Sequence, residues 1–255
     1  MADITVYNHG EVEDADQVNW RGDQVNVDQG GQSIYKSSSV KLADLGARKV
    51  VGDRVFRYSK ALGPIGAGDV AMNNQANLIL VTAGSANASG GKVFTFYFAT
   101  SNAAGVYDDG YLISQSGTAA NLGYSYKVKT QPIVATTSTA NLTLYDPLTL
   151  VANVTDKWSL FSNPYGRLTE NTAGTGPTSG VAPLAVTTND YFWLQTWGPC
   201  NVKAGAALVS GDGFVAGATG QIGPAIATTG GTLGHVIQPV LTVSQYGFVW
   251  LTIAP

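Results

Sequence analysis

Two short stretches of alternating aromatic and aliphatic residues hold three of the five tryptophans of the chain. The first runs from Tyr191 to Cys200 and the second from Gly247 to Pro255. Alternation with a period of two is typical of β-strands, and aromatic residues at both parities of the first stretch predict that both of its faces are covered. We therefore expect these two stretches to be the central strands of a β core.

Further short apolar stretches, separated by Gly, Asn, Asp and Pro, recur about every ten residues from position 61 onward, a spacing typical of sandwiches and barrels. The pattern predicts strands at 78–82, 92–100, 111–113, 124–130, 133–136, 141–145 and 157–161, and alternation before this series predicts a further strand at 53–60. Asp109-Gly110 is expected to form a hairpin turn, and Gly68 to Asn77 is the main candidate for a short helix. The predicted fold class is all-β, with a Gly/Thr-rich sandwich or barrel-like body.

Residues 1–33 differ from the rest, because they carry seven of the 17 acidic residues, one basic residue and few large apolar side chains. This composition predicts an extended acidic arm without a core of its own. Alternation at four positions leaves room for one short strand that pairs with another surface: Val18, Trp20, Val25 and Val27. Residues 34–255 are expected to form the body, which has room for two sub-domains with a boundary near 170–180. A faint internal echo relates Pro64–Ala71 to Pro199–Ala207.

Charge is concentrated in the first quarter of the chain. Residues 34–60 contain seven basic residues, among which four define an expected basic band: Arg48, Lys49, Arg54 and Arg57. Charged residues make up only 12% of the chain, about half of the roughly 25% usual for soluble domains. A net charge of −3 argues against nucleic acid or an anionic membrane as a partner. We expect large uncharged surfaces to be covered by other copies or by a larger partner.

The residues that usually carry chemistry are sparse. His9 and His235 stand far apart, and the single cysteine, Cys200, excludes an intrachain disulfide. Nucleophile elbows, phosphate loops and metal-ligand spacings are absent from the sequence. We therefore expect no catalytic residues, no metal and no cofactor. The first residues lack the pattern of a secretory signal, and no apolar run is long enough to span a membrane, so synthesis and folding in a cytoplasm are expected.

Several motifs resemble those of tailed-phage capsid decoration (cement) proteins and other small phage head proteins. They are Arg54-Val-Phe-Arg-Tyr-Ser, Gly63-Pro-Ile-Gly-Ala-Gly-Asp-Val, Tyr191-Phe-Trp-Leu-Gln-Thr-Trp-Gly-Pro, Val202-Lys-Ala-Gly and Gly247-Phe-Val-Trp-Leu. The resemblance implies a structural virion protein, not an enzyme, that binds the capsid exterior where subunits of the major capsid protein meet. It also implies a homotrimer that uses a terminal arm, here residues 1–33, to reach neighbouring coat subunits.

A carbohydrate-binding or adhesin-like β module on a virion or cell surface is the alternative. Large aromatic side chains exposed in loops would favour it, and the candidates are Tyr107, Tyr111 and Tyr165. Aromatic residues confined to strands would favour a decoration protein.

Overall fold

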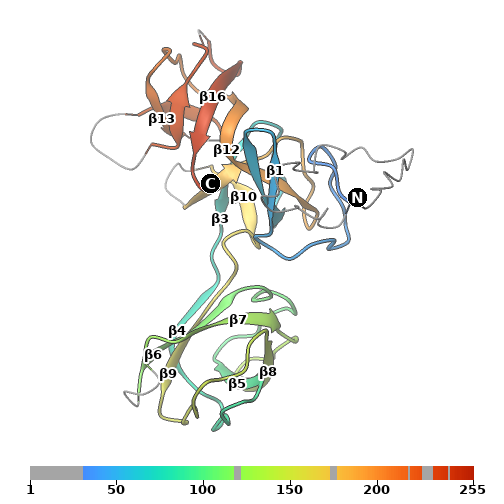
Figure 1. The fold of residues 1–255 in the computed structure, drawn as a ribbon, viewed down its shortest axis with the longest axis vertical. Coiled ribbons are helices and arrows are strands. Elements are labelled where there is room, and N and C mark those ends of the chain that lie inside the picture. The colour runs from blue at the N-terminus through green and yellow to red at the C-terminus, as the bar shows by residue number, and fades with distance from the viewer. Residues whose placement is uncertain (1–30, 118–121, 173–176, 218, 226–231, 241) are drawn as a thin grey trace, which may run out of the picture.

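The structure is a computed structural model that describes residues 31–117, 122–172, 177–217, 219–225, 232–240 and 242–255. These residues form sixteen strands and no helix, which confirms the all-β prediction. Figure 1 shows two bodies joined by two extended connections. The arm at 1–33 lies almost wholly outside the described residues.

The main body is a ten-stranded sheet in which all strand pairs are antiparallel. Its strands are β1 (Arg48–Val51), β2 (Arg54–Lys60), β3 (Val70–Asn73), β10 (Leu168–Glu170), β11 (Thr178–Val181), β12 (Tyr191–Lys203), β13 (Gly213–Ala216), β14 (Ile222–Pro224), β15 (Gly234–Val236) and β16 (Tyr246–Thr252). The order is β10-β3-β11-β12-β16-β15-β13-β14, and the β1–β2 hairpin pairs with β12 through β2. The two stretches expected at the centre are the interior strands β12 and β16.

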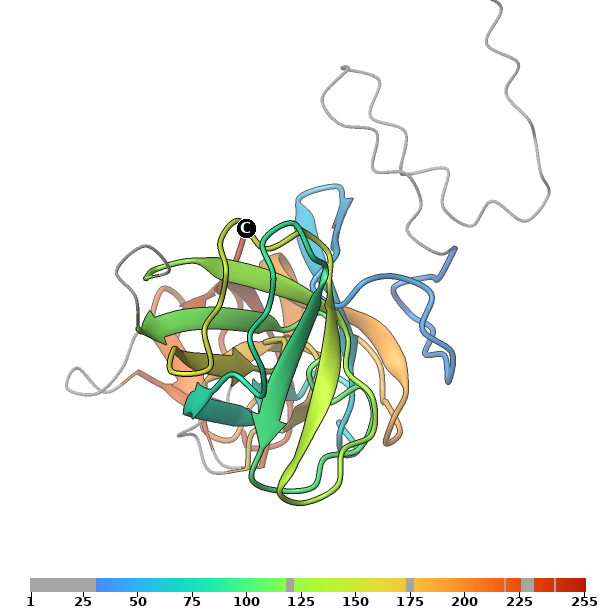
Figure 2. The ribbon, with the colours of Figure 1, turned by 90° about the horizontal axis from the view of Figure 1, so that it is seen from below.

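The second body is inserted into the first, between β3 and β10 (Figure 1). Its strands are β4 (Asn77–Thr82), β5 (Val93–Phe98), β6 (Tyr111–Ser116), β7 (Ser125–Thr130), β8 (Ser138–Leu144) and β9 (Lys157–Phe161). They form an antiparallel sheet in the order β4-β9-β6-β7-β8-β5. A bridge between Ala83 and Phe96 brings its two ends together, so that the sheet curls on itself (Figure 2).

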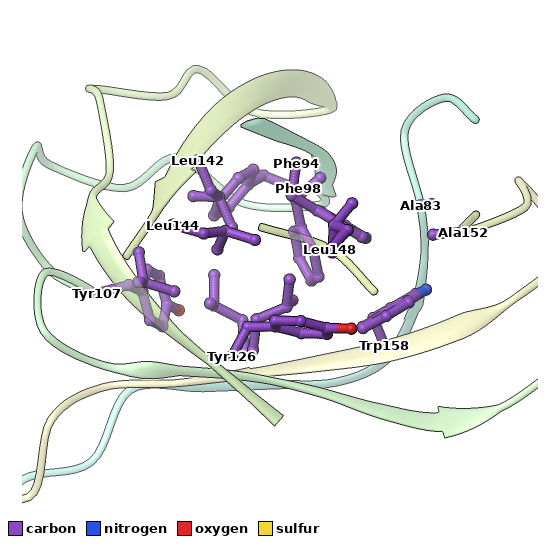
Figure 3. Packing of buried hydrophobic residues seen from close by; sticks show 14 of the residues in the cluster. Ala83, Phe94, Phe98, Tyr107, Tyr126, Leu142, Leu144, Leu148, Ala152 and Trp158 are labelled. Atoms are coloured by element: carbon purple, nitrogen blue, oxygen red, sulfur yellow. The ribbon is translucent and has the colours of Figure 1, made fainter. Parts of the chain in front are cut away.

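Aromatic side chains fill the inserted body. Phe94 packs against Trp158 with ring centroids 4.8 Å apart, and Phe96 packs against Phe98 at 5.1 Å. Figure 3 shows Phe94, Phe98 and Trp158 around one interior with Leu142, Leu144 and Leu148, and Phe96 belongs to the same cluster. This core is separate from those of the main body.

The expected sub-domain boundary at 170–180 falls between β10 and β11 of the main body, and both of these strands pair with β3.

The first half of β12 is buried on both faces. Phe192 and Leu194 enter one core of the main body, whereas Trp193 enters another beneath the β1–β2 hairpin. Trp193 contacts the ring of Tyr58 edge-on at 5.0 Å, and its indole N–H donates to the carbonyl of Gln32. In β12, apolar and aromatic residues at both odd and even positions therefore do correspond to a strand that is covered on both faces.

The prediction of a helix at Gly68 to Asn77 is wrong, because Val70–Asn73 is strand β3. The strand lies between β10 and β11 and pairs with both. Residues far away in the sequence provide hydrogen-bond partners for its backbone; for example, the Val70 N–H donates to the carbonyl of Gly220. Tertiary pairing outweighs a weak local helical preference here.

One corner motif recurs throughout both bodies. Two loops meet in a reciprocal pair of backbone hydrogen bonds, and a strand follows each loop; the described pairs are Ile65–Val186, Asn87–Ala152, Asn102–Val134 and Leu208–Val240. In most loops the third residue after the bridge has a positive φ, as in Gly68, Asn189 and Gly211. The similarity between Pro64–Ala71 and Pro199–Ala207 in the sequence reflects this motif, but its alignment is shifted. Pro199 lies within strand β12, and the loop that corresponds to Ile65–Val70 is Leu208–Gly213.

In three of these loops an aspartate follows the residue with positive φ, and in two loops an aspartate carboxylate accepts a hydrogen bond from within the loop. The Asp156 carboxylate accepts from the N–H of Asn153, and the Asp190 carboxylate accepts from the hydroxyl of Thr187. Short-range hydrogen bonds between an aspartate and a group three residues earlier stabilise such loops. Two of the eight acidic residues after position 60, Asp156 and Asp190, therefore serve the corners.

Gly198, the one glycine of β12, is predicted to tolerate substitution poorly. It lies where β12 leaves β2 for β16, with φ +86°, and an added Cβ would stand 2.3 Å from the carbonyl oxygen of Asp53. Gly211, the matched control, has φ +89° and open space around it. In urea unfolding we expect Gly211→Ala to cost about 1–2 kcal/mol for the left-handed backbone. Gly198→Ala should cost a further ~1–3 kcal/mol for the forced contact; equal costs would contradict this assignment.

Candidate functional site: an aromatic sheet face and a junction between the bodies

The second half of β12 and all of β16 bury one face and expose the other. Inward residues from these strands, such as Val202, Val249 and Leu251, are fully buried in the C-terminal core of the main body. The intervening residues of β12 and β16 face outward and are exposed or half-buried. We call this outer surface the aromatic face; it consists of Trp197, Pro199, Asn201, Lys203, His235, Tyr246, Phe248, Trp250 and Thr252.

Strand register places the aromatic side chains of this face side by side. Trp250 is paired with Pro199 on one side and His235 on the other, and Phe248 is paired with Asn201. The imidazole of His235 stacks on the indole of Trp250, with ring planes inclined by 10°. Tyr246 is 57% exposed and Phe248 is 38% exposed. Aromatic side chains on a sheet surface lose little entropy when a partner covers them, and they commonly anchor interfaces.

A hollow of 440 Å³ adjoins the aromatic face at Phe248 and Tyr246. On its other side lies Tyr35, which is 59% exposed and whose hydroxyl accepts a hydrogen bond from the Arg54 guanidinium. The Tyr246 hydroxyl donates to the carbonyl of Ala67, which fixes that ring at the edge of the hollow. The aromatic face is therefore continuous with a shallow recess rather than isolated.

The second feature of interest is the junction between the bodies, which is organised by Asp109. Its side chain is fully buried and accepts hydrogen bonds from the Lys41 ammonium at 2.7 Å, the Leu45 N–H at 2.9 Å and the Tyr145 hydroxyl at 2.8 Å. Lys41 and Leu45 belong to the loop before β1, whereas Asp109 and Tyr145 belong to the inserted body. One carboxylate thus ties the two bodies together.

The interpretation of Asp109-Gly110 as a hairpin turn is wrong. β5 pairs with β8, and β6 pairs with β7 and β9, so the segment between β5 and β6 does not join paired strands. Asp109 does adopt a positive φ of 56°, as turn aspartates often do, but its side chain points into the junction. The connection from the inserted body back to β10 supplies Asn163, whose amide donates to the carbonyls of Leu45 and Asp109.

The structure separates the four residues of the expected basic band. Arg48 is exposed, but Lys49 is 2% exposed, and its ammonium donates to the carbonyl of Gln32 and lies 5.3 Å from the centroid of the Trp193 ring. Arg54 holds Tyr35 beside the aromatic face, and Arg57 lies on the junction side of the hairpin. The arm residues Val18, Trp20, Val25 and Val27 lie outside the described residues.

The three tyrosines that would favour sugar binding occupy different environments. Tyr107 is buried in the core of the inserted body, where burial raises the pKa of its hydroxyl. Tyr111 is 39% exposed at the start of β6, and Tyr165 is half-buried on the connection that leads to β10. The most exposed aromatic residue on a strand is Tyr246 of the aromatic face, within the part of the chain that the structure describes.

Groups that could hold a metal are absent from the described residues, where no three His, Cys, Asp or Glu side chains come together. His235 is engaged with Trp250, and Cys200 is buried, which raises the pKa of its thiol to about 12. A thiol with so high a pKa is a poor nucleophile at neutral pH. Among the same residues, no helix is long and apolar enough to cross a membrane.

Comparisons with protein-family models, with curated proteins and with solved structures give no match to this chain.

The aromatic face was missed in the sequence, although a signal for it exists. From Tyr246 to Thr252, large aromatic residues alternate strictly with Gly247, Val249 and Leu251. Such alternation is typical of a strand with one buried face and one open face. In Tyr191 to Thr196, by contrast, apolar residues occupy both odd and even positions, as in a strand that is buried on both faces. The two stretches therefore differ in sequence, and β16 could have been identified as open on one side.

Proposed function

We propose that this chain is a structural virion protein that binds the outer surface of a phage capsid and stabilises the junctions between coat subunits. The observation that carries the proposal is the aromatic face of β12, β16 and β15, an open sheet surface with adjacent Trp, Phe, Tyr and His side chains. Exposed apolar surfaces of this kind mark sites of protein interaction in soluble proteins. The sequence resemblance to decoration proteins supplies the class of partner.

The chemistry of the rest of the molecule agrees with a binding role. Positions 61–255 carry only six basic and eight acidic residues, and the corner motif engages two of the acids, Asp156 and Asp190. Coat lattices fail at their subunit junctions, and a protein that spans a junction adds buried area there without any chemical step. Several moderate contacts on one rigid assembly give high avidity.

The quaternary state that fits this role is a homotrimer on the capsid exterior, assembled in the host cytoplasm. Its subunit interface would use low-charge strands of the body. Residues 1–33 would reach neighbouring coat subunits, with Val18, Trp20, Val25 and Val27 forming an added strand or lying in a groove. Light scattering at micromolar concentration tests the trimer.

Sugar binding by exposed loop aromatics is the weaker alternative. Tyr107, one of its three candidates, is part of a core, whereas Tyr246 and Phe248 lie exposed on strand β16 of the aromatic face.

The test is whether the protein travels with particles. Particles from a lysate whose phage genome encodes this chain are purified on a density gradient, and the ratio of this chain to the most abundant particle protein is measured by mass spectrometry. We expect a fixed stoichiometric ratio across the particle peak. Particles from a phage with the gene deleted should release their DNA at a lower temperature. A chain found only in the soluble fraction would overturn the proposal.

A further inference from the structure

A second hollow, of 480 Å³, lies at the junction between the two bodies. Its lining comes from the loop before β1 and strand β2 of the main body, from β6 and β7 of the inserted body, and from the connection to β10. The residues that line it are Asp44, Leu45, Gly46, Ala47, Arg57, Tyr111, Lys127, Asn163, Pro164 and Tyr165. Its size suits a ligand of one or two sugar rings.

Two cations from different bodies face this hollow. Arg57 comes from β2 and Lys127 from β7, and no Asp or Glu side chain of the described residues lies within ion-pair distance of either. Asp44 is the one acid in the lining, but its carboxylate is 56% exposed and lies 3.8 Å from the ammonium of Lys41. Two basic side chains and one acidic side chain thus line the hollow.

Arg57 is held in place and retains donor capacity. Its guanidinium donates to the Gly46 carbonyl at 3.3 Å and to the Pro255 oxygen at 2.9 Å. These bonds use two of the five N–H donors of the guanidinium. Because Arg57 lines the hollow, its remaining donor capacity is available to an anion bound there.

Two tyrosines complete the lining of the hollow. Tyr111 and Tyr165 both border the hollow, and burial raises the pKa of the Tyr165 hydroxyl, with Arg57 opposing and Tyr111 adding to the effect. The hydroxyl therefore stays protonated and able to donate at neutral pH. Tyrosine rings offer a face for a sugar ring, and their hydroxyls offer hydrogen bonds to its polar edge.

We propose that the junction hollow binds a monosaccharide that carries one anionic group, a carboxylate or a phosphate. Arg57 and Lys127 contact the anionic group from the two bodies, and Tyr111 and Tyr165 contact the sugar ring. Such a ligand joins the β1–β2 hairpin region to the inserted body and stabilises their arrangement. This site is independent of the aromatic face and of the proposed role on the capsid.

Calorimetric titration of the full chain with glucuronate, glucose 6-phosphate, glucose and inorganic phosphate tests the inference. We expect both acidic sugars to bind with Kd on the order of 1 mM, as is usual for small polar ligands. Glucose and phosphate should each bind at least tenfold more weakly. Phosphate that binds as tightly as glucose 6-phosphate would overturn the assignment, because the sugar ring would then contribute nothing. Absence of binding by both acidic sugars at 10-fold higher concentration would overturn it too.

Substitutions can distinguish binding in the hollow from nonspecific attraction of an anionic ligand to the basic surface. Lys127→Gln should weaken both acidic sugars about tenfold, the loss of one charge-assisted contact. Lys129→Gln, on the same strand and outside the lining, should leave binding unchanged. Tyr111→Ala, at a 39% exposed position, should weaken the sugars but not phosphate. If Lys129→Gln weakens binding as much as Lys127→Gln, binding is diffuse and the site is not the hollow.

Discussion

Asp109→Ala should destabilise the protein by about 3–5 kcal/mol, the usual cost of removing one partner from a buried charged contact. The substitution leaves the N–H of Leu45 and the hydroxyl of Tyr145 without their acceptor, and Lys41 loses its closest carboxylate. Alanine also tolerates the positive φ at position 109 poorly. Urea unfolding followed by circular dichroism measures the change.

The position of the loss matters as much as its size. Hydrogen exchange should show faster exchange at Leu45 and in the loop before β1, whereas the aromatic core of the inserted body around Phe94 and Trp158 should stay protected. Asp146→Ala is the matched control, since Asp146 is exposed in the same body, and it should change stability by less than about 0.5 kcal/mol. If Asp109→Ala unfolds like the unmodified chain, the carboxylate does not hold the junction.

Trp250→Ala should reduce binding to capsids about 30-fold or more, because central aromatic residues typically contribute 2 kcal/mol or more to an interface. Trp250 lies at the middle of the aromatic face, between Pro199 and His235, and its indole stacks on the imidazole. Binding is measured by co-sedimentation with particles from the gene-deleted phage.

A second variant guards against loss of folding. Phe248→Ala removes a ring that is 38% exposed and should weaken binding by about tenfold without lowering the melting temperature. Ile133→Ala is the control, because Ile133 is 78% exposed but lies on the inserted body. Full particle binding by both face variants would remove the aromatic face from the capsid interface. Dissociation of the trimer with binding per subunit unchanged would reassign the face to contacts between copies.

Much of the fold could be predicted from the sequence where local pattern and tertiary role agree. Tyr191 to Thr196 shows apolar residues at both parities, and the strand is covered by two different cores. The sequence could not predict that β4 to β9 form an inserted body, because both bodies are built from short apolar stretches separated by the same kinds of turn residue. Insertion is decided by which strands pair, and single-strand patterns carry little information on pairing.

The errors have the same origin. Gly68 to Asn77 is short and rich in small residues, and only its pairing with β10 and β11 makes part of it a strand. Asp109-Gly110 has the local chemistry of a turn, but the carboxylate is committed to Lys41 and Leu45, which are far away in sequence. Arg57 and Lys127 likewise meet at one hollow only because the inserted body folds back toward β2.

The most direct test of the capsid role is a cryo-electron microscopy reconstruction of particles that carry the full chain, compared with gene-deleted particles. We predict extra density on the outside of the shell at coat-subunit junctions, into which the main and inserted bodies fit with the aromatic face toward the coat. Extra density with the aromatic face toward solvent would contradict the proposed mode of binding. Identical reconstructions from the two kinds of particle would contradict the function itself.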